Sequence, residues 1–196
     1  MILYIIVAYL IGSIPTGYLI VKILKGEDIR KIGSGSTGAT NVKRVMGKKW
    51  FFITLFLDLI KGMLPVILAK HFIPVSFDGG FTAVMSAVAV LLGHSKSIFL
   101  KFTGGKSVAS GVGTLLALNW QAFLVFAILW ITITKVSKYI SLASIIAIWS
   151  APISLFLFGA PLAYVVYGLV GAVYITYLHR ENVQRLLNGN ENKTEF

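Results

Sequence analysis

The chain has 196 residues, of which 57% are hydrophobic and only 13% charged, and its mean hydropathy is +0.84. Soluble domains carry roughly 25% charged residues, so this composition excludes an ordinary soluble protein. Its 18 Lys and Arg residues outnumber 7 Asp and Glu residues, and the net charge of +11 is expected beside membrane spans rather than in a nucleic-acid groove. Because cysteine is absent from the sequence, disulfides, thiolate metal sites and a thioester acyl-enzyme are excluded.

The apolar residues form about seven runs, each a candidate membrane-spanning helix. The first run has neither the basic segment nor the cleavage site of a signal peptide, so we expect a retained transmembrane helix. For two short runs, 81–93 and 107–118, a re-entrant helix competes with a full crossing. An interfacial break at residues 119–121 divides the stretch around it into a hairpin. The runs lie at 1–21, 50–70, 79–94, 107–118, 120–134, 140–158 and 161–178.

Most of the basic residues follow the first, third, fifth and last runs, whereas the opposite loops contain only Lys70. Under the positive-inside rule this distribution places the N-terminus outside and the C-terminus in the cytoplasm. The expected fold is therefore an all-α, polytopic membrane helix bundle. We expect a single transmembrane domain over residues 1–187, containing the functional site, and a polar tail over 188–196 that frays.

The loop after the first run, residues 33–44, is rich in glycine and hydroxyl side chains, and we call it the cradle loop. Its glycines let the backbone turn N–H groups toward one point, and its side chains add donors for an anion. A flexible basic linker is the alternative, but the Thr-Asn-x-x-Arg ending favours a phosphate site. The candidate phosphate-binding residues are Ser34, Ser36, Thr40, Asn41 and Arg44.

A second glycine-containing segment, residues 103–107, precedes an apolar run, and we call it the diglycine loop. It is not a nucleotide P-loop, because Leu100 stands where that motif requires glycine. Gly104, Gly105 and Lys106 are nevertheless expected at a helix N-terminus, where unpaired N–H groups and the helix dipole favour an anion. Basic residues that only mark topology would explain the charge but not the paired glycines.

A third polar cluster, residues 179–185, follows the last run. If the helix continues, the three-residue spacing places His179 and Asn182 on one face, with Arg180 beside them. An interfacial cap is the alternative, although basic residues alone would serve that purpose. Ser141, at the start of another run, could cap a helix on the same side of the membrane.

Together these clusters suggest a polar substrate with more than one phosphate-like group, bound at one membrane face. The histidines and carboxylates are scattered, so we expect no metal site, and no pattern for a covalent serine mechanism is present. Asp58 and Lys61 lie within the second run. A structural ion pair is favoured there over a proton relay.

The three clusters resemble the cytoplasmic motifs of the bacterial acyl-phosphate-dependent glycerol-3-phosphate acyltransferases, the PlsY family. Residues 12–18, 58–62 and 179–189 extend the resemblance over nearly the whole chain, while Ser36-Thr37 and Thr103 depart from the usual family pattern. The resemblance implies a multi-pass enzyme of the bacterial inner membrane, with its active site on the cytoplasmic face. Such an enzyme transfers an acyl group from acyl phosphate to the 1-hydroxyl of glycerol 3-phosphate, with no cofactor, nucleic acid or obligate protein partner.

On this reading Lys106, with Gly104, Gly105 and Ser141, holds one phosphate, and the cradle loop contacts the other. We expect Arg180 to bind phosphate as well, and His179, Asn182 and Lys106 to be the catalytic residues. His179 can accept a proton near neutral pH, but a substrate phosphate oxygen could accept the same proton, and both routes stay open. A phosphate or organic-anion membrane transporter is the alternative function.

Overall fold

The computed structural model describes residues 2–194, and its regular elements in that range are helices without a strand. Contacts divide the chain into two compact units, Met1–Thr114 and Leu115–Phe196. The predicted all-α membrane fold is confirmed. A single domain over residues 1–187 and the sidedness of the termini stay predictions.

Among the described residues, four helical segments are long and apolar enough to cross a membrane: Ile2–Lys25, Lys48–Phe72, Trp120–Ser137 and Ile140–Leu157. A fifth candidate is a pair of helices, Leu162–Leu178 and Arg180–Leu187, bent by 61° at their junction. Phe81–Ser95 and Val108–Leu118 are shorter apolar helices, as the short runs predicted. The expected number of about seven crossings stays a prediction.

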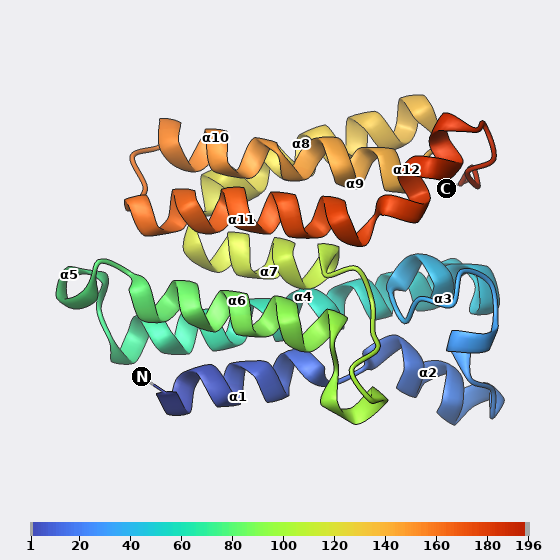
Figure 1. Cartoon of the computed structure of the whole chain (residues 1–196), viewed down its shortest axis with the longest axis horizontal. Coiled ribbons are helices and arrows are strands. Elements are labelled where there is room, and N and C mark those ends of the chain that lie inside the picture. Colours follow the sequence, from blue (N-terminus) through green and yellow to red (C-terminus); the bar gives the residue numbers. More distant parts are fainter. Residues whose placement is uncertain (1, 195–196) are drawn as a thin grey trace. The chain divides into compact units, whose positions relative to one another are not determined.

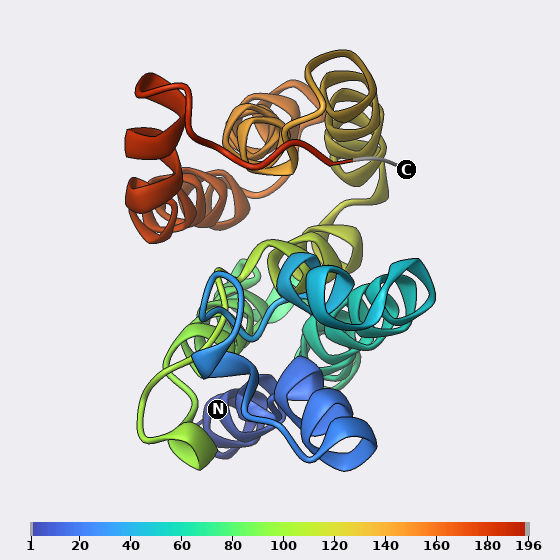
Figure 2. The ribbon, with the colours of Figure 1, turned by 90° about the vertical axis from the view of Figure 1, so that its right-hand side faces the viewer.

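In the first unit, the helix α6 lies along α1 and α4, and α3 packs on α4 (Figure 1). Figure 2 views the same helices from one end. The elements of this unit are α1 (Ile2–Ser13), α2 (Thr16–Lys25), η1 (Ile29–Lys31), α3 (Ala39–Met46), α4 (Lys48–Phe72), α5 (Val75–Asp78), α6 (Phe81–Ser95), η2 (Ile98–Leu100) and the part of α7 (Val108–Leu118) as far as Thr114.

The first run forms a helical segment long and apolar enough to cross a membrane, as predicted, but the helix is interrupted after Ser13. The helix stops at Ser13 and resumes at Thr16, because Pro15 has no N–H to continue the hydrogen-bond ladder. The break leaves the Ile14 carbonyl available, and Lys61 Nζ of α4 donates a 2.7 Å hydrogen bond to it.

Close glycine contacts hold the helices of the first unit together, as small residues are expected to do in lipid. A Cβ added to Gly62 of α4 would lie 2.1 Å from the Ser110 carbonyl oxygen of α7. A Cβ added to Gly113 of α7 would lie 2.1 Å from the Leu59 carbonyl oxygen of α4. The two helix backbones therefore touch at positions where only glycine fits.

In the second unit, α9 packs on α8, and α10 packs on α8 and α11 (Figure 1). The α9 and α10 helices form one apolar span interrupted at Trp149, and α12 contacts both α9 and α11. The helices are α8 (Trp120–Ser137), α9 (Ile140–Ile148), α10 (Ser150–Leu157), α11 (Leu162–Leu178) and α12 (Arg180–Leu187).

The polar tail contacts the rest of the second unit as far as Thr194, and the expectation that it frays stays a prediction. Glu191 is buried, the Thr194 N–H donates a 2.7 Å hydrogen bond to the Lys138 carbonyl, and Lys193 Nζ lies 5.9 Å from the centroid of the Tyr139 ring. The tail is pinned because its few polar groups find partners at the start of α9 and on α12.

Candidate functional site

The cradle loop is shaped by the buried side chain of Asn41. Asn41 Nδ2 donates hydrogen bonds to the carbonyl oxygens of Ile32 and Ser36, each at 2.9 Å, and Asn41 Oδ1 accepts a 3.0 Å bond from the Ser34 N–H. One side chain thus fastens the two arms of the loop. This arrangement gives Asn41 a structural task, and a direct contact between Asn41 and phosphate stays a prediction.

The other predicted cradle residues surround the start of α3. Ser34 and Arg44 are exposed, Ser36 and Thr40 are partly buried, and the Ser36 hydroxyl accepts a 3.3 Å hydrogen bond from the Gly38 N–H. All of them belong to one continuous loop and helix start. Their binding to phosphate stays a prediction.

The diglycine loop is held against the end of α6. The Gly105 N–H donates a 3.1 Å hydrogen bond to the His94 carbonyl, and the Ser107 hydroxyl donates a 2.8 Å bond to the Leu91 carbonyl. The α7 helix begins at Val108, directly after this loop, so the predicted helix start is confirmed. Gly104, Gly105 and Lys106 therefore lie at that helix start, as the sequence indicated.

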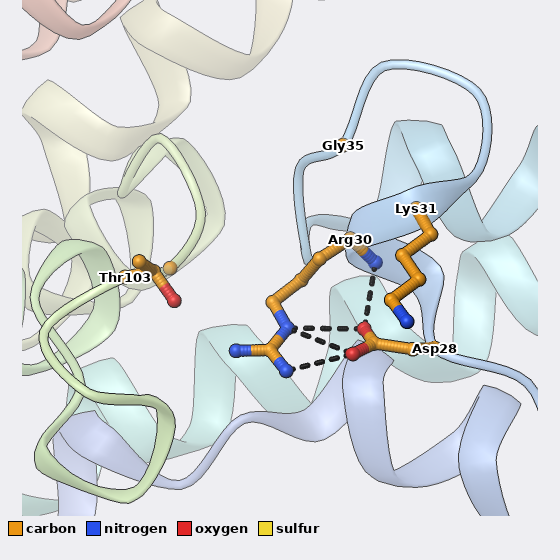
Figure 3. A pocket seen from close by; sticks show the side chains of 6 residues that line it. Asp28, Arg30, Lys31, Gly35 and Thr103 are labelled. Carbon is orange, nitrogen blue, oxygen red and sulfur yellow. Dashed lines mark hydrogen bonds and ion pairs between the residues drawn. The ribbon is translucent and has the colours of Figure 1, made fainter.

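A cavity of about 340 Å³ brings the cradle loop and the diglycine loop together within the first unit (Figure 3). We call it the loop pocket. Figure 3 shows Arg30 and Thr103 on opposite sides of it. Asp28, Arg30 and Lys31 were not predicted from the sequence, in which the two basic residues counted only as markers of topology. The lining residues are Asp28, Arg30, Lys31, Gly35, Thr103 and Gly104.

Arg30 is oriented in the loop pocket by Asp28. Arg30 Nε lies 3.0 Å and 3.2 Å from the two Asp28 carboxylate oxygens, and Arg30 Nη2 lies 2.7 Å from Asp28 Oδ2. The guanidinium also lies 5.3 Å from the Tyr18 ring centroid, which favours a cation–π contact. The hydrogen bonds from Arg30 lower the pKa of Asp28 to about 2, so the pair stays charged at neutral pH. The side of the guanidinium away from Asp28 keeps donors for an anion.

In the second unit, His179 lies at the bend between α11 and α12 and is buried. Its Nδ1 is 2.7 Å from the Ile175 carbonyl oxygen, which can only accept a hydrogen bond. The proton of a neutral ring therefore belongs on Nδ1, and Nε2 is the nitrogen able to accept a proton. This tautomer is compatible with the predicted role as a general base.

The predicted residues Ser141 and Asn182 meet at a carboxylate that the sequence analysis missed. Glu191 Oε1 accepts hydrogen bonds from Ser141 Oγ at 3.0 Å and Asn182 Nδ2 at 2.8 Å, and Arg185 Nε lies 2.7 Å from Glu191 Oε2. Arg180 instead lies exposed on α12, with its guanidinium 4.8 Å from the Tyr177 ring centroid. Ser141 and Asn182 thus each use a donor on Glu191, and their contact with substrate stays a prediction.

Replacing Glu191 with glutamine is expected to destabilise the protein by about 2 kcal/mol at pH 7, because Arg185 loses its charged partner. Burial raises the pKa of Glu191, but hydrogen bonds from Arg185, Asn182 and Ser141 outweigh it, and the pKa lies below its ordinary value. The ion pair therefore stabilises the fold above about pH 4.5, and the benefit is lost as pH falls through the lowered pKa.

Thermal unfolding in detergent at pH 7 and at successively lower pH checks this prediction for Glu191. The wild type and Glu191→Gln should converge in stability as the pH falls. Equal midpoints at pH 7 would contradict it. Glu181→Gln is the matched control, since Glu181 is exposed on α12, the short helix that contains Arg185.

Comparison with known proteins decides the family. The glycerol-3-phosphate acyltransferase family model matches residues 2–189. The chain belongs to the glycerol-3-phosphate acyltransferase family. It is 46% identical to glycerol-3-phosphate acyltransferase 2 of Thermotoga maritima, covering 99% of this chain and 96% of that protein. It is 43% identical to the Trichormus variabilis glycerol-3-phosphate acyltransferase, over 96% of this chain and 89% of that protein.

Solved structures of this family agree with the fold. The crystal structure of PlsY, an integral membrane glycerol 3-phosphate acyltransferase, in its glycerol 3-phosphate form has a TM-score of 0.94 and 38% identity, covering 99% of this chain and 95% of that one. Its lysophosphatidic acid form has a TM-score of 0.91 and 36% identity. The resemblance to the PlsY family inferred from the sequence is therefore confirmed, as is a multi-pass membrane protein.

Proposed function

We propose that this family member transfers a fatty acyl group from acyl phosphate to the 1-hydroxyl of glycerol 3-phosphate. The hydroxyl oxygen attacks the acyl carbonyl carbon, and the bond between that carbon and the phosphate oxygen breaks. Phosphate leaves with the electron pair, and the hydroxyl proton passes to His179 or to a phosphate oxygen. The products are lysophosphatidic acid and inorganic phosphate.

The observation that carries this proposal is the loop pocket, in which two glycine-containing loops face the basic residues Arg30 and Lys31. A phosphate group needs hydrogen-bond donors and positive charge at one place, and the side chains of Arg30 and Lys31 supply both at this pocket. We propose that one substrate phosphate binds there, with Gly104 and Lys106 on one side and the cradle residues on the other. Family membership supports glycerol 3-phosphate as a substrate.

An acyl phosphate is a mixed anhydride and is already activated toward attack. The protein then needs to position a hydroxyl and to neutralise charge on the leaving phosphate, and it needs no covalent nucleophile. The absence of cysteine from the sequence fits this chemistry. The acyl chain would lie among the apolar helices, where lipid already surrounds the protein.

The decisive test incubates the purified protein in detergent with glycerol 3-phosphate and, in separate reactions, an acyl phosphate or an acyl thioester. We expect monoacyl product and stoichiometric phosphate from acyl phosphate only. Product from the thioester alone would overturn the proposed donor. The absence of any product, together with phosphate flux into protein-containing liposomes, would favour the transporter.

We also propose that the site faces the cytoplasm of a bacterial cell and that the enzyme resides in the inner membrane. The basic residues that follow alternate spans support this sidedness. In the same assay, everted inner-membrane vesicles should convert added glycerol 3-phosphate to product. Intact spheroplasts that cannot import glycerol 3-phosphate should not. The reverse result would contradict the orientation.

Replacing His179 with glutamine should separate the two possible proton acceptors. If His179 is the base, kcat falls about 100-fold or more at every pH, because general-base catalysis contributes 10²–10⁴-fold. A substantial residual rate with an unchanged acidic limb in the pH profile of kcat would instead assign the proton to a substrate phosphate. Replacing the exposed His71 with glutamine is the matched control and should leave the profile unchanged.

A further inference from the structure

His94 lies directly beneath the diglycine loop, at the end of α6 in the first unit. Its side chain is buried, and atoms of its ring are the nearest neighbours that a Cβ built on Gly105 would meet. A Cβ added to Gly105 would lie 2.2 Å from His94 Nε2, 3.0 Å from Cδ2 and 3.3 Å from Cε1. The His94 backbone carbonyl also accepts the Gly105 N–H, at 3.1 Å. One residue therefore contacts Gly105 through both its side chain and its backbone.

A buried ion pair lies on the other side of the His94 ring. Asp58 Oδ1 lies 3.8 Å from His94 Nδ1 and 2.8 Å from Lys61 Nζ, and it accepts a 2.6 Å hydrogen bond from Thr16 Oγ1. Asp58, Lys61 and His94 are each at most 8% exposed. As expected from the sequence, Asp58 and Lys61 form a pair, and that pair joins α4 to the broken end of α1 and to α6.

Two polar atoms of this cluster lack a hydrogen bond among the described residues, namely Asp58 Oδ2 and His94 Nδ1. Burying a polar atom without a partner costs about 1–3 kcal/mol, so such atoms need a reason to persist in a fold. Packing alone would be served by an apolar side chain at position 94. The cluster instead contains the planar His94 ring, which has the Asp58 carboxylate on one side and the diglycine loop on the other.

We infer that His94 is a positioning residue for the phosphate-binding diglycine loop, with its ring between that loop and the Asp58–Lys61 pair. The inference rests on the proposed function, because it concerns the loop that binds a phosphate group. The ring fills the space next to Gly105, and its position limits how far the Gly105 backbone can move toward α6. Substrate phosphate then meets a diglycine loop whose position is already set before binding, which lowers the cost of ordering the loop.

The two glycines of the loop differ in a way that makes this inference testable. A Cβ on Gly105 meets only the His94 side chain within the three nearest contacts, whereas a Cβ on Gly104 would lie 2.2 Å from the His94 carbonyl oxygen and 2.9 Å from Ser95 backbone atoms. Truncating the His94 side chain therefore makes room for alanine at position 105 but not at position 104. Neither glycine has a positive φ, so alanine can adopt the backbone dihedral angles found at both positions.

The experiment is a double-mutant cycle of Gly105→Ala with His94→Ala, read as the KM for glycerol 3-phosphate, the KM for acyl phosphate and kcat. Because displacing a binding loop by about 1 Å can cost 10²-fold, Gly105→Ala alone should raise one KM about 10-fold or more. In the His94→Ala background the same change should raise it no more than about 2-fold. The cost of Gly104→Ala should be equal in both backgrounds.

Two further measurements keep structural collapse apart from positioning. Ser86→Ala is the matched control, since Ser86 is fully buried on the same helix and away from the loop, and it should leave both KM values unchanged. His94→Phe keeps a ring above Gly105, so its KM should lie closer to wild type than that of His94→Ala. Each variant is compared at equal monodispersity and thermal midpoint in detergent.

Additive costs for Gly105→Ala and His94→Ala, or equal relief of Gly104→Ala, would overturn the inference. The proposed function can fail separately, since it fails when the wild type makes no product. In that case the same cycle is measured as the Kd of inorganic phosphate by titration calorimetry. Non-additivity restricted to position 105 would then still support His94 as the residue that shapes the loop.

Discussion

Replacing Arg30 with glutamine is expected to lower kcat/KM for one of the two phosphate substrates about 30- to 100-fold. A hydrogen bond between a charged donor and phosphate contributes about 2–3 kcal/mol, and each 1.4 kcal/mol corresponds to a factor of ten. Arg30 lines the loop pocket and is held there by the Asp28 carboxylate and the Tyr18 ring. Steady-state kinetics with each substrate varied in turn identifies which phosphate Arg30 contacts.

The conservative variant Arg30→Lys should recover only part of this loss, because lysine cannot reproduce the two-pronged pairing with Asp28 and still present a fork of donors. Lys49→Gln is the matched control. Lys49 is an exposed basic residue at the start of α4 and does not line the loop pocket. If Arg30→Gln and Lys49→Gln have the same kcat/KM for both substrates, the charge at position 30 serves only to orient the chain in the membrane.

Replacing Gly62 with alanine is expected to destabilise the first unit by about 3 kcal/mol or more. The new methyl group would lie 2.1 Å from the Ser110 carbonyl oxygen, and a backbone atom in a helix cannot move aside as a side chain can. The α4 and α7 helices would have to separate, which also moves the diglycine loop at the start of α7. The yield of monodisperse protein and the thermal midpoint in detergent check this outcome.

Gly168→Ala in α11 is the comparison for Gly62→Ala. There the nearest contacts of an added Cβ are 3.0 Å to a Leu155 side-chain atom and 3.1 Å to Pro152 backbone atoms. Smaller shifts relieve this crowding, so the loss of stability should be less than half of that for Gly62→Ala. Equal losses at the two positions would contradict the argument from backbone contact.

The helices could be predicted closely because each must present an apolar surface as long as the lipid is thick. Predicted runs at 50–70 and 140–158 became helical segments at Lys48–Phe72 and Ile140–Leu157. The predicted first run, 1–21, became the segment Ile2–Lys25, but its interruption at Pro15 was not predicted. Lys61 stabilises that break from another helix, 47 residues further along the chain.

The candidate site could be predicted in part. Glycine and hydroxyl patterns revealed the cradle and diglycine loops, because such residues have few other uses beside a membrane span. Arg30 and Glu191 were missed for the opposite reason. A basic residue after a span is expected from topology alone, and one carboxylate in a polar tail has no pattern around it. Their importance comes from partners and cavities that the folded chain creates.

Composition and motif spacing were sufficient to establish a helical membrane protein and to predict phosphate-binding loops, because lipid and phosphate each impose requirements that are local in the chain. Tertiary structure alone decided which groups share a site. It placed Arg30 across a pocket from Gly104, gathered Ser141, Asn182 and Arg185 around Glu191, and set the His94 ring against Gly105. These contacts join residues on different elements, and local patterns along the chain do not reveal which elements touch.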